Sequence, residues 1–144
     1  MITLSQAKNY LRIDDDFTED DESILRMIKA AFQFIEKRTN HVFFQEERTY
    51  NRLDRKYIDI FDYPVSYDGE LTKLDYSGFT RFDADSVTVT VGYASEYDVP
   101  SPLIEAALQM LKVFYYEAEK QVNTTLIPES VNQILNDYRR FTVC

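Results

Sequence analysis

The spacing of apolar residues changes twice along the chain, and this constrains the fold more than any other sequence feature. Near both ends, apolar residues recur every three or four positions, which is typical of amphipathic helices. In the middle, valine and threonine alternate from Val87 to Val91, which predicts a strand with one buried face. Helical segments on either side of a strand-rich segment predict an α+β fold.

Two helices are predicted before the strand-rich segment. Thr3 and Gln6 form a capping-box pattern at the start of the first helix. Thr18 is the predicted N-cap of the second helix, which runs to about Thr39 and stops at Asn40, a residue that tolerates the left-handed conformation. The predicted buried stripe of the second helix consists of Ile24, Leu25, Ile28, Ala31, Phe32 and Ile35.

Strands and tight turns are predicted in the middle of the chain. Tyr57–Phe61, Leu71–Tyr76 and Ser86–Val91 have the composition of strands. Asp68-Gly69 and Ser77-Gly78 are turn signals. Because the connections are short, antiparallel pairing is expected.

Two further helices are predicted after the strands. Ser101 and Pro102 suit the start of a third helix, which ends between Glu119 and Asn123, and Pro128 starts a fourth. Their predicted buried residues are Leu103, Ile104, Ala107, Leu108, Leu111, Phe114 and Tyr115 in the third helix, and Val131, Ile134, Leu135 and Tyr138 in the fourth.

The predicted fold is therefore α+β and mainly helical, with four helices and a small antiparallel β-sheet or β-arm between the second and third. We expect one domain over residues 1–144. Its helical core would comprise residues 1–42 and 99–140, and residues 43–98 would form the β-rich arm or sheet.

Charge and hydropathy exclude several classes of protein. The net charge is −9, without the basic patch that binding to phosphates requires, so tight DNA binding is not expected. No apolar run reaches the roughly 20 residues of a membrane span, and the N-terminus lacks the pattern of a signal peptide. We therefore expect a protein that is made in the cytoplasm and has no membrane partner.

The sequence offers little material for catalysis. It contains one histidine, His41, one cysteine, Cys144, and three glycines, so a standard zinc site or phosphate-binding loop does not fit. A calcium loop that starts at Asp14 would need glycine at its sixth position and glutamate at its twelfth, where Glu19 and Leu25 stand. We expect no enzyme activity, no metal and no cofactor.

The N-terminal pattern resembles that of the head–tail connector (adaptor, or head-completion) proteins of tailed bacteriophages. In that family, a short helix that ends in a leucine-arginine-hydrophobic-acid run precedes a long helix. Here Leu11-Arg12-Ile13-Asp14 provides the run, and Ile24–Glu36 resembles the long helix. A threonine-glycine pair commonly closes that helix in the family, whereas this chain has Thr39-Asn40.

The C-terminal half is similar to the same family. Val89–Tyr93 resembles its strand, Val99–Leu108 its proline pair and third helix, and Ile127–Arg139 its closing proline and short helix. Residues 43–85 carry little of the resemblance. The order and spacing of these segments carry the resemblance, because each of them consists mainly of packing and capping residues.

The resemblance implies a structural virion protein at the neck. Such proteins form homo-oligomeric rings of about a dozen subunits below the portal protein, extend the DNA channel and dock a stopper, tail-completion or tail protein. DNA passes through the ring without specific binding. An excess of aromatic side chains, 11 Tyr and 10 Phe, suits a subunit with more than one contact surface.

Three groups of residues are candidates for these contacts. For the interface with the portal or a neighbouring subunit they are Arg139, Arg140, Phe141, Thr142 and Val143. For contacts of the arm they are Tyr57, Ile60, Phe61, Tyr63 and Tyr67, although a local core is the simpler interpretation of Ile60 and Phe61. For the channel face they are Asp14, Asp15, Asp16, Asp20 and Asp21, for which helix capping and solvation are the alternative.

Two other functions remain open at this point. Another neck component, such as a stopper or tail-completion protein, would share the acidity but not the helical pattern at both ends. An acidic inhibitor that mimics nucleic acid would spread carboxylates along one face of most of the chain, whereas here they concentrate in residues 14–22.

Overall fold

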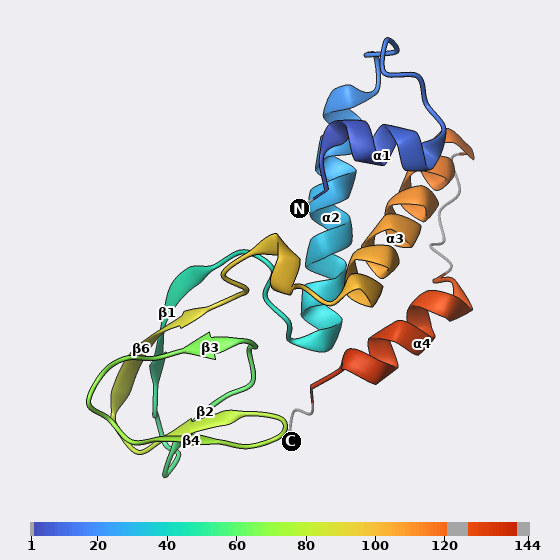
Figure 1. Cartoon of the computed structure of the whole chain (residues 1–144). Helices are drawn as coiled ribbons and strands as arrows, with labels where there is room; N and C mark the ends of the chain where they lie inside the picture. Colours follow the sequence, from blue (N-terminus) through green and yellow to red (C-terminus); the bar gives the residue numbers. More distant parts are fainter. Residues whose placement is uncertain (1, 121–126, 141–144) are drawn as a thin grey trace. The chain divides into compact units, whose positions relative to one another are not determined.

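A computed structural model describes residues 2–120 and 127–140, the side chains of 118–120 excepted. The described residues form four α-helices, one short 3-10 helix and six β-strands (Figure 1). The chain divides into two compact units, one of Met1–Arg38 with Pro100–Tyr138 and one of Thr39–Val99 with Arg139–Cys144. The predicted class, a mainly helical α+β fold with antiparallel strands between the second and third helices, is confirmed.

The first unit is helical. Its helices are α1 (Leu4–Leu11), α2 (Asp21–Thr39), α3 (Ser101–Lys120) and α4 (Glu129–Tyr138). Helix α3 contacts both α1 and α4. The buried side chains are Ala7, Leu11, Ile24, Ile28, Ala31, Phe32, Ile35, Leu103, Ala106, Ala107, Met110, Leu111, Tyr115, Val131 and Leu135. Because these residues recur at helical spacing, each helix has one apolar face and buries it in this core.

Local capping explains the ends of two helices. The hydroxyl of Thr3 accepts from the backbone N–H of Gln6, and the Gln6 side chain accepts from the Thr3 N–H, so the predicted capping box is confirmed. Arg12 and Asn40 both have φ of 60°, which places α1 and α2 immediately before left-handed residues. This conformation ends a helix by turning the chain out of the i to i−4 hydrogen-bond pattern.

Three predictions about the helices were wrong in detail. Helix α2 begins at Asp21, because Thr18 sits in a preceding turn in which its carbonyl oxygen accepts from the Asp21 N–H at 3.3 Å. Leu25 is 52% exposed and lies outside the buried stripe. Ser101 is the first residue of α3 rather than its cap, since the Pro100 carbonyl already accepts from the Leu103 N–H at 3.0 Å.

The second unit, the β-unit, contains all the described strands. They are β1 (Glu46–Asn51), β2 (Ile58–Ile60), β3 (Val65–Ser66), β4 (Lys73–Asp75), β5 (Thr80–Phe82) and β6 (Ser86–Val91), followed by the 3-10 helix η1 (Glu96–Asp98). They form two three-stranded antiparallel sheets, in the orders β1-β6-β3 and β2-β5-β4. The strands are short, and both sheets bury side chains in one common cluster.

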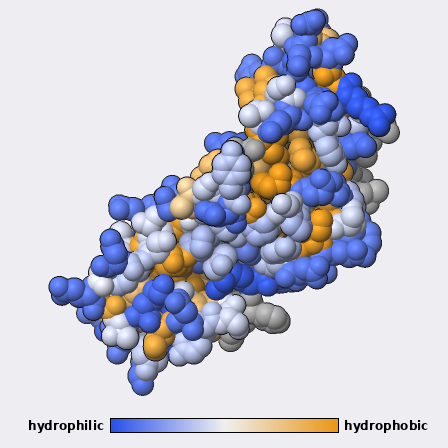
Figure 2. All heavy atoms as spheres, in the orientation of Figure 1, coloured by the Kyte–Doolittle hydropathy of each residue, from blue (hydrophilic) through white to orange (hydrophobic). Residues whose placement is uncertain are grey.

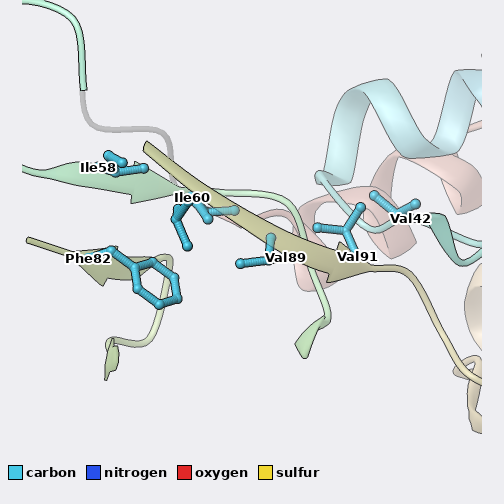
Figure 3. Packing of buried hydrophobic residues seen from close by; sticks show 7 residues of the cluster. Val42, Ile58, Ile60, Phe82, Val89 and Val91 are labelled. Atoms are coloured by element: carbon cyan, nitrogen blue, oxygen red, sulfur yellow. The ribbon is translucent and has the colours of Figure 1, made fainter. Parts of the chain in front are cut away.

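Residues of both sheets make up this cluster (Figure 3). Val87, Val89 and Val91 of β6 are buried as the alternation predicts, whereas Thr88 points to the other face and its hydroxyl lies 2.8 Å from that of Thr49. The other buried members are Val42, Ile58, Ile60 and Phe82. Complete burial of one such side chain contributes roughly 1.5–3 kcal/mol, so this cluster is sufficient reason for the two sheets to stay together.

Strands β1, β3 and β5 were not predicted from the sequence. In β1 most residues are polar and exposed, so its sequence has no buried alternation to detect. It forms a strand because each of its six residues pairs with β6, from Glu46 opposite Val91 to Asn51 opposite Ser86. Strands β3 and β5 contain only two and three residues, too few for a recognisable period.

Candidate interaction surfaces

Lys8 holds the acidic segment between α1 and α2 in place. Its side chain is 3% exposed and lies 2.6 Å from the Oδ1 atom of Asp21. The ammonium group also donates to the backbone carbonyls of Asp15 at 3.2 Å and Phe17 at 2.6 Å. A buried charge needs such partners, because burial without them is costly. Lys8 was not predicted from the sequence, although its position on the buried face of α1 was the available signal.

The five predicted channel residues fall into two groups. Asp14, Asp15 and Asp16 are exposed. Asp20 accepts a hydrogen bond from the Tyr115 hydroxyl at 2.8 Å, and Asp21 is paired with Lys8. The carboxylates of Asp20 and Asp21 therefore stabilise the helical unit, while the other three present their charge to solvent. The location of these three in a channel stays a prediction.

The described residues show no metal centre and no membrane segment. Within them, no three His, Cys, Asp or Glu side chains are placed so that they could hold a metal ion. None of the described helices is both long and apolar enough to cross a membrane.

Arg81 is the centre of an aromatic group on the β-unit. Its Nε and Nη2 atoms donate to the two carboxylate oxygens of Asp59 on the paired strand, at 2.7 and 2.9 Å. The guanidinium lies 4.7 Å from the ring centre of Tyr57, 5.2 Å from Phe79 and 5.6 Å from Tyr76. The hydrogen bonds to Asp59 raise the pKa of Arg81. The bidentate ion pair of Arg81 with Asp59 joins β5 to β2 and holds the guanidinium against the three rings at the end of the sheet.

The other predicted arm residues differ in their surroundings. Ile60 is 1% exposed and belongs to the cluster between the sheets. Tyr67 packs edge-to-face on Phe82, with ring centres 4.9 Å apart. Phe61 is half-buried and its ring contacts Phe79 of the Arg81 group at 5.6 Å. Tyr63, at 38% exposure, is the most exposed of the five residues. Contacts of these side chains with another subunit stay a prediction.

The predicted C-terminal contact group is described only in part. Arg139 is exposed, while Phe141, Thr142 and Val143 lie outside the described residues. The guanidinium of Arg140 lies 4.3 Å from the ring centre of Tyr63, and its backbone N–H donates to the Thr39 carbonyl at 3.2 Å. Burial lowers the pKa of Arg140. Arg140 therefore fixes the start of the C-terminal segment to the β-unit.

His41 lies beside this anchor and was not predicted as part of it. Its side chain is buried, and Nδ1 is 2.6 Å from the Tyr93 hydroxyl. Its ring also meets Tyr63 in a T-shaped contact, with centres 5.2 Å apart. Because three residues distant in sequence form this group, no local pattern could have revealed it.

Arg48 and Tyr50 of β1 form a polar group with Asp62 at the edge of the buried cluster between the two sheets. The Tyr50 hydroxyl donates to Asp62, whose Oδ2 atom also lies 3.1 Å from Nη1 of Arg48. Burial of the phenol and its hydrogen bond to Asp62 raise the pKa of Tyr50 above its usual value. The neutral phenol is therefore the form that the folded state stabilises.

Two surface cavities are candidates for binding a partner. In the helical unit, a cavity of about 310 Å³ lies between α1 and α3, and its lining is mainly apolar. It is lined by Ile2, Gln6, Asn9, Tyr10, Ile104 and Leu108. Burial and the nearby carboxylate of Glu105 together raise the pKa of Tyr10. In the β-unit, Tyr57 and Arg81 line a wider and more polar cavity of about 520 Å³.

Exposed apolar side chains are distributed over both units. The large ones are Phe17, Leu25, Phe44, Leu53, Tyr63, Leu71, Leu74, Tyr76, Tyr97 and Tyr116. Figure 2 shows the strongly hydrophobic residues of one face as several patches among mainly hydrophilic residues. Leu53 and Tyr97 are the most exposed, at 87% and 89%. Leu53 also has φ of 53°, a conformation that leucine rarely adopts.

Comparison with known proteins supports the family predicted from the sequence. Residues 1–68 match the model of the phage gp6-like head–tail connector protein family. This match includes α1, α2 and the first strands, and so reaches into the middle segment that carried little resemblance. Residues 1–68 therefore have the sequence pattern of this family, and the predicted resemblance to it is confirmed. No curated protein matches the chain.

Solved structures share the fold over nearly the whole chain. One is a chain of the virion of a native gene transfer agent (GTA) particle, with a TM-score of 0.70 and 17% identity. Another is a chain of the neck of an empty GTA particle computed with C6 symmetry, with a TM-score of 0.69 and 18% identity. Each alignment covers 98% of this chain and 90% of the other.

Proposed function

We propose that this chain is a structural subunit of the neck of a tailed-phage virion. In this role it forms a ring below the portal protein, extends the DNA channel and docks the next neck or tail component. The observation that carries the proposal is the match of residues 1–68 to the head–tail connector family. The similarity of the fold to a chain of the GTA neck supports the same place in the particle.

The described surfaces are compatible with a ring subunit. A ring needs two different faces on each subunit, because its contacts run head to tail. Exposed apolar residues occur on both units, and the two cavities have different linings. These features support contacts with a neighbouring copy and with the portal, and they require no catalytic or cofactor chemistry.

Charge supports a passive role toward DNA. The exposed carboxylates of Asp14, Asp15 and Asp16 belong to a chain with a net charge of −9. Facing a channel, they would repel phosphates and let a duplex slide without binding. The Tyr115 hydroxyl holds Asp20 and the Lys8 ammonium holds Asp21 in the fold. The three exposed carboxylates are therefore the candidates for the channel face.

The test is the mass of the purified chain, alone and mixed with its portal protein, by light scattering after size exclusion. The proposal predicts a ring of about a dozen subunits, either alone or on the portal. Electron microscopy of the portal complex would then locate the ring relative to the portal channel.

The same experiment separates the alternatives. A stopper or tail-completion protein would bind only after another neck protein has been added. An acidic inhibitor would stay monomeric and ignore the portal, and it would compete with nucleic acid for a basic partner. Either result would overturn the proposal.

A further inference from the structure

We propose that Leu53 of one copy inserts into the groove between α1 and α3 of the next copy, and that this contact forms the head-to-tail interface of the ring. The inference deepens the proposed function and rests on it. The occupant of the groove is a second copy of this chain. The part of that copy that enters and borders the groove is the loop of residues 52–56.

The position of Leu53 does not help to stabilise its own subunit. Its side chain is 87% exposed and therefore gains almost nothing from burial. Its φ of 53° puts it in the left-handed region, where a Cβ atom causes strain and glycine or asparagine is preferred. A leucine that is both strained and exposed is explained by a contact outside its own subunit.

The loop presents this leucine in a fixed position. The Arg52 N–H donates to the Asp85 carbonyl at 2.9 Å, and the Arg55 N–H closes a turn on the Arg52 carbonyl at 3.1 Å. The Arg52 guanidinium pairs with Asp85 and lies 3.7 Å from Asp83. An anchored loop loses little conformational entropy when it binds, which favours a specific contact.

The groove between α1 and α3 has the properties that such a leucine requires. Ile2, Tyr10, Ile104 and Leu108 provide apolar walls around a volume of about 310 Å³. Gln6 and Asn9 line the same groove and offer polar groups to a neighbouring backbone. An apolar side chain in an apolar pocket with a polar rim is the usual anatomy of an interface anchor.

The charges of the two surfaces are complementary. Arg52 is already paired with Asp85 and Asp83. The other charged residues of the loop, Asp54, Arg55 and Lys56, give it a net charge of +1 in a chain with a net charge of −9. Glu105 stands next to the groove, beside Tyr10. Glu105 therefore gives the groove a nearby carboxylate for the basic residues of the loop. The leucine itself favours this apolar groove over the more polar cavity of the β-unit, whose lining includes the charged side chains of Glu70, Arg81 and Asp83.

Disulfide trapping between two pools of protein tests the contact directly. Both pools carry Cys144→Ser, which removes the one native cysteine. One pool then carries Leu53→Cys and the other Asn9→Cys, with tags of different mass. The pools are mixed, assembled with the portal protein and mildly oxidised. We expect a disulfide between the pools in the ring fraction. Tyr97→Cys, which replaces a residue of equal exposure, should form no such link with Asn9→Cys.

A second variant separates assembly from stability. Leu53→Asn suits the left-handed backbone better, so the melting temperature should stay the same or rise. Ring formation should nevertheless require at least about tenfold more protein, because the apolar anchor has been removed. Absence of the disulfide link, or normal rings from Leu53→Asn, would overturn the inference while leaving the proposed function intact. If the unmodified chain forms no ring with or without portal, the proposed function fails first and the inference with it.

Discussion

At the scale of residues, a few buried polar groups connect segments that the apolar core does not hold. Lys8 binds the acidic segment through Asp21 and two backbone carbonyls. Arg140 and His41 gather around Tyr63, where the C-terminal segment meets the β-unit. The Lys8 ammonium is held by defined oxygen partners, whereas the Arg140 guanidinium is held by the face of the Tyr63 ring while its buried Nε atom has no hydrogen-bond partner.

Replacing Lys8 with methionine should destabilise the helical unit. The variant retains the apolar stem but leaves the Asp21 carboxylate and the carbonyls of Asp15 and Phe17 without their donor. We expect a loss of roughly 2–3 kcal/mol in the free energy of unfolding, measured with urea. Lys112→Met, which changes an exposed lysine of α3, is the control and should cost much less. Equal losses for the two variants would contradict the structural role of Lys8.

Tyr50→Phe should change how stability depends on pH. The pKa of Tyr50 is raised in the folded state by burial and by Asp62, so its contribution is complete below about pH 10 and is lost as the pH rises further. At neutral pH the variant should be less stable by about 1 kcal/mol, because a hydrogen bond to Asp62 is removed. This difference should shrink between about pH 10 and 12 in urea titrations. All other residues are the same in the two proteins, so their contributions cancel in the comparison.

At the scale of elements, the β-unit depends on close approaches between short strands. Strand β6 pairs with β1 on one side and with β3 on the other. Just beyond β6, Gly92 has φ of 106°, and its N–H donates to the Pro64 carbonyl at 2.9 Å. A Cβ at this position would lie 2.7 Å from the Phe44 carbonyl oxygen. The end of β6 therefore requires glycine for two independent reasons, backbone conformation and space.

Gly92→Ala should accordingly be one of the most damaging small substitutions in the β-unit. The left-handed strain and the clash with backbone together should cost about 2–4 kcal/mol in the free energy of unfolding. Gly69→Ala is the matched comparison, because its new Cβ would meet only the far end of the Tyr67 side chain, 2.3 Å from the hydroxyl oxygen. That ring can move aside, so its cost should be smaller. Chemical denaturation that ranked the two variants in the opposite order would contradict this account.

At the scale of the whole molecule, the proposed place in a DNA channel predicts that net charge affects the passage of DNA more than it affects folding. Neutralising Asp14, Asp15 and Asp16 to asparagine changes the net charge from −9 to −6, that is −9 + 3. Because these side chains are exposed, the free energy of unfolding should change by no more than about 0.5 kcal/mol. Particles assembled with the variant should release DNA more slowly, since a channel wall that repels phosphate less retains the duplex longer.

The control for this prediction removes the same charge elsewhere. Glu47→Gln, Asp68→Asn and Asp98→Asn neutralise three exposed acids of the β-unit. If both triple variants release DNA at the rate of the unmodified particle, the acidic segment does not face the channel. If both slow release equally, total charge rather than position is responsible.

Features that depend on near neighbours in the chain can be predicted from the amino-acid sequence alone. The capping box of Thr3 and Gln6, the left-handed stop at Asn40 and the alternation of β6 all involve residues within a few positions, so their patterns are visible in one dimension. The same order of segments led to the connector family. Leu25 shows the limit of such patterns, because a helical repeat does not indicate how far around the helix the core extends.

Features that join residues distant in sequence become apparent only in the folded chain. Strand β1 has no buried period and exists because β6 pairs with it, some 40 residues away in sequence. Asp20 and Asp21 belong to the fold rather than to a free acidic face because Tyr115 and Lys8 reach them. Burial and partner geometry come from the packing of the whole chain, and the energetic role of a polar side chain depends on both.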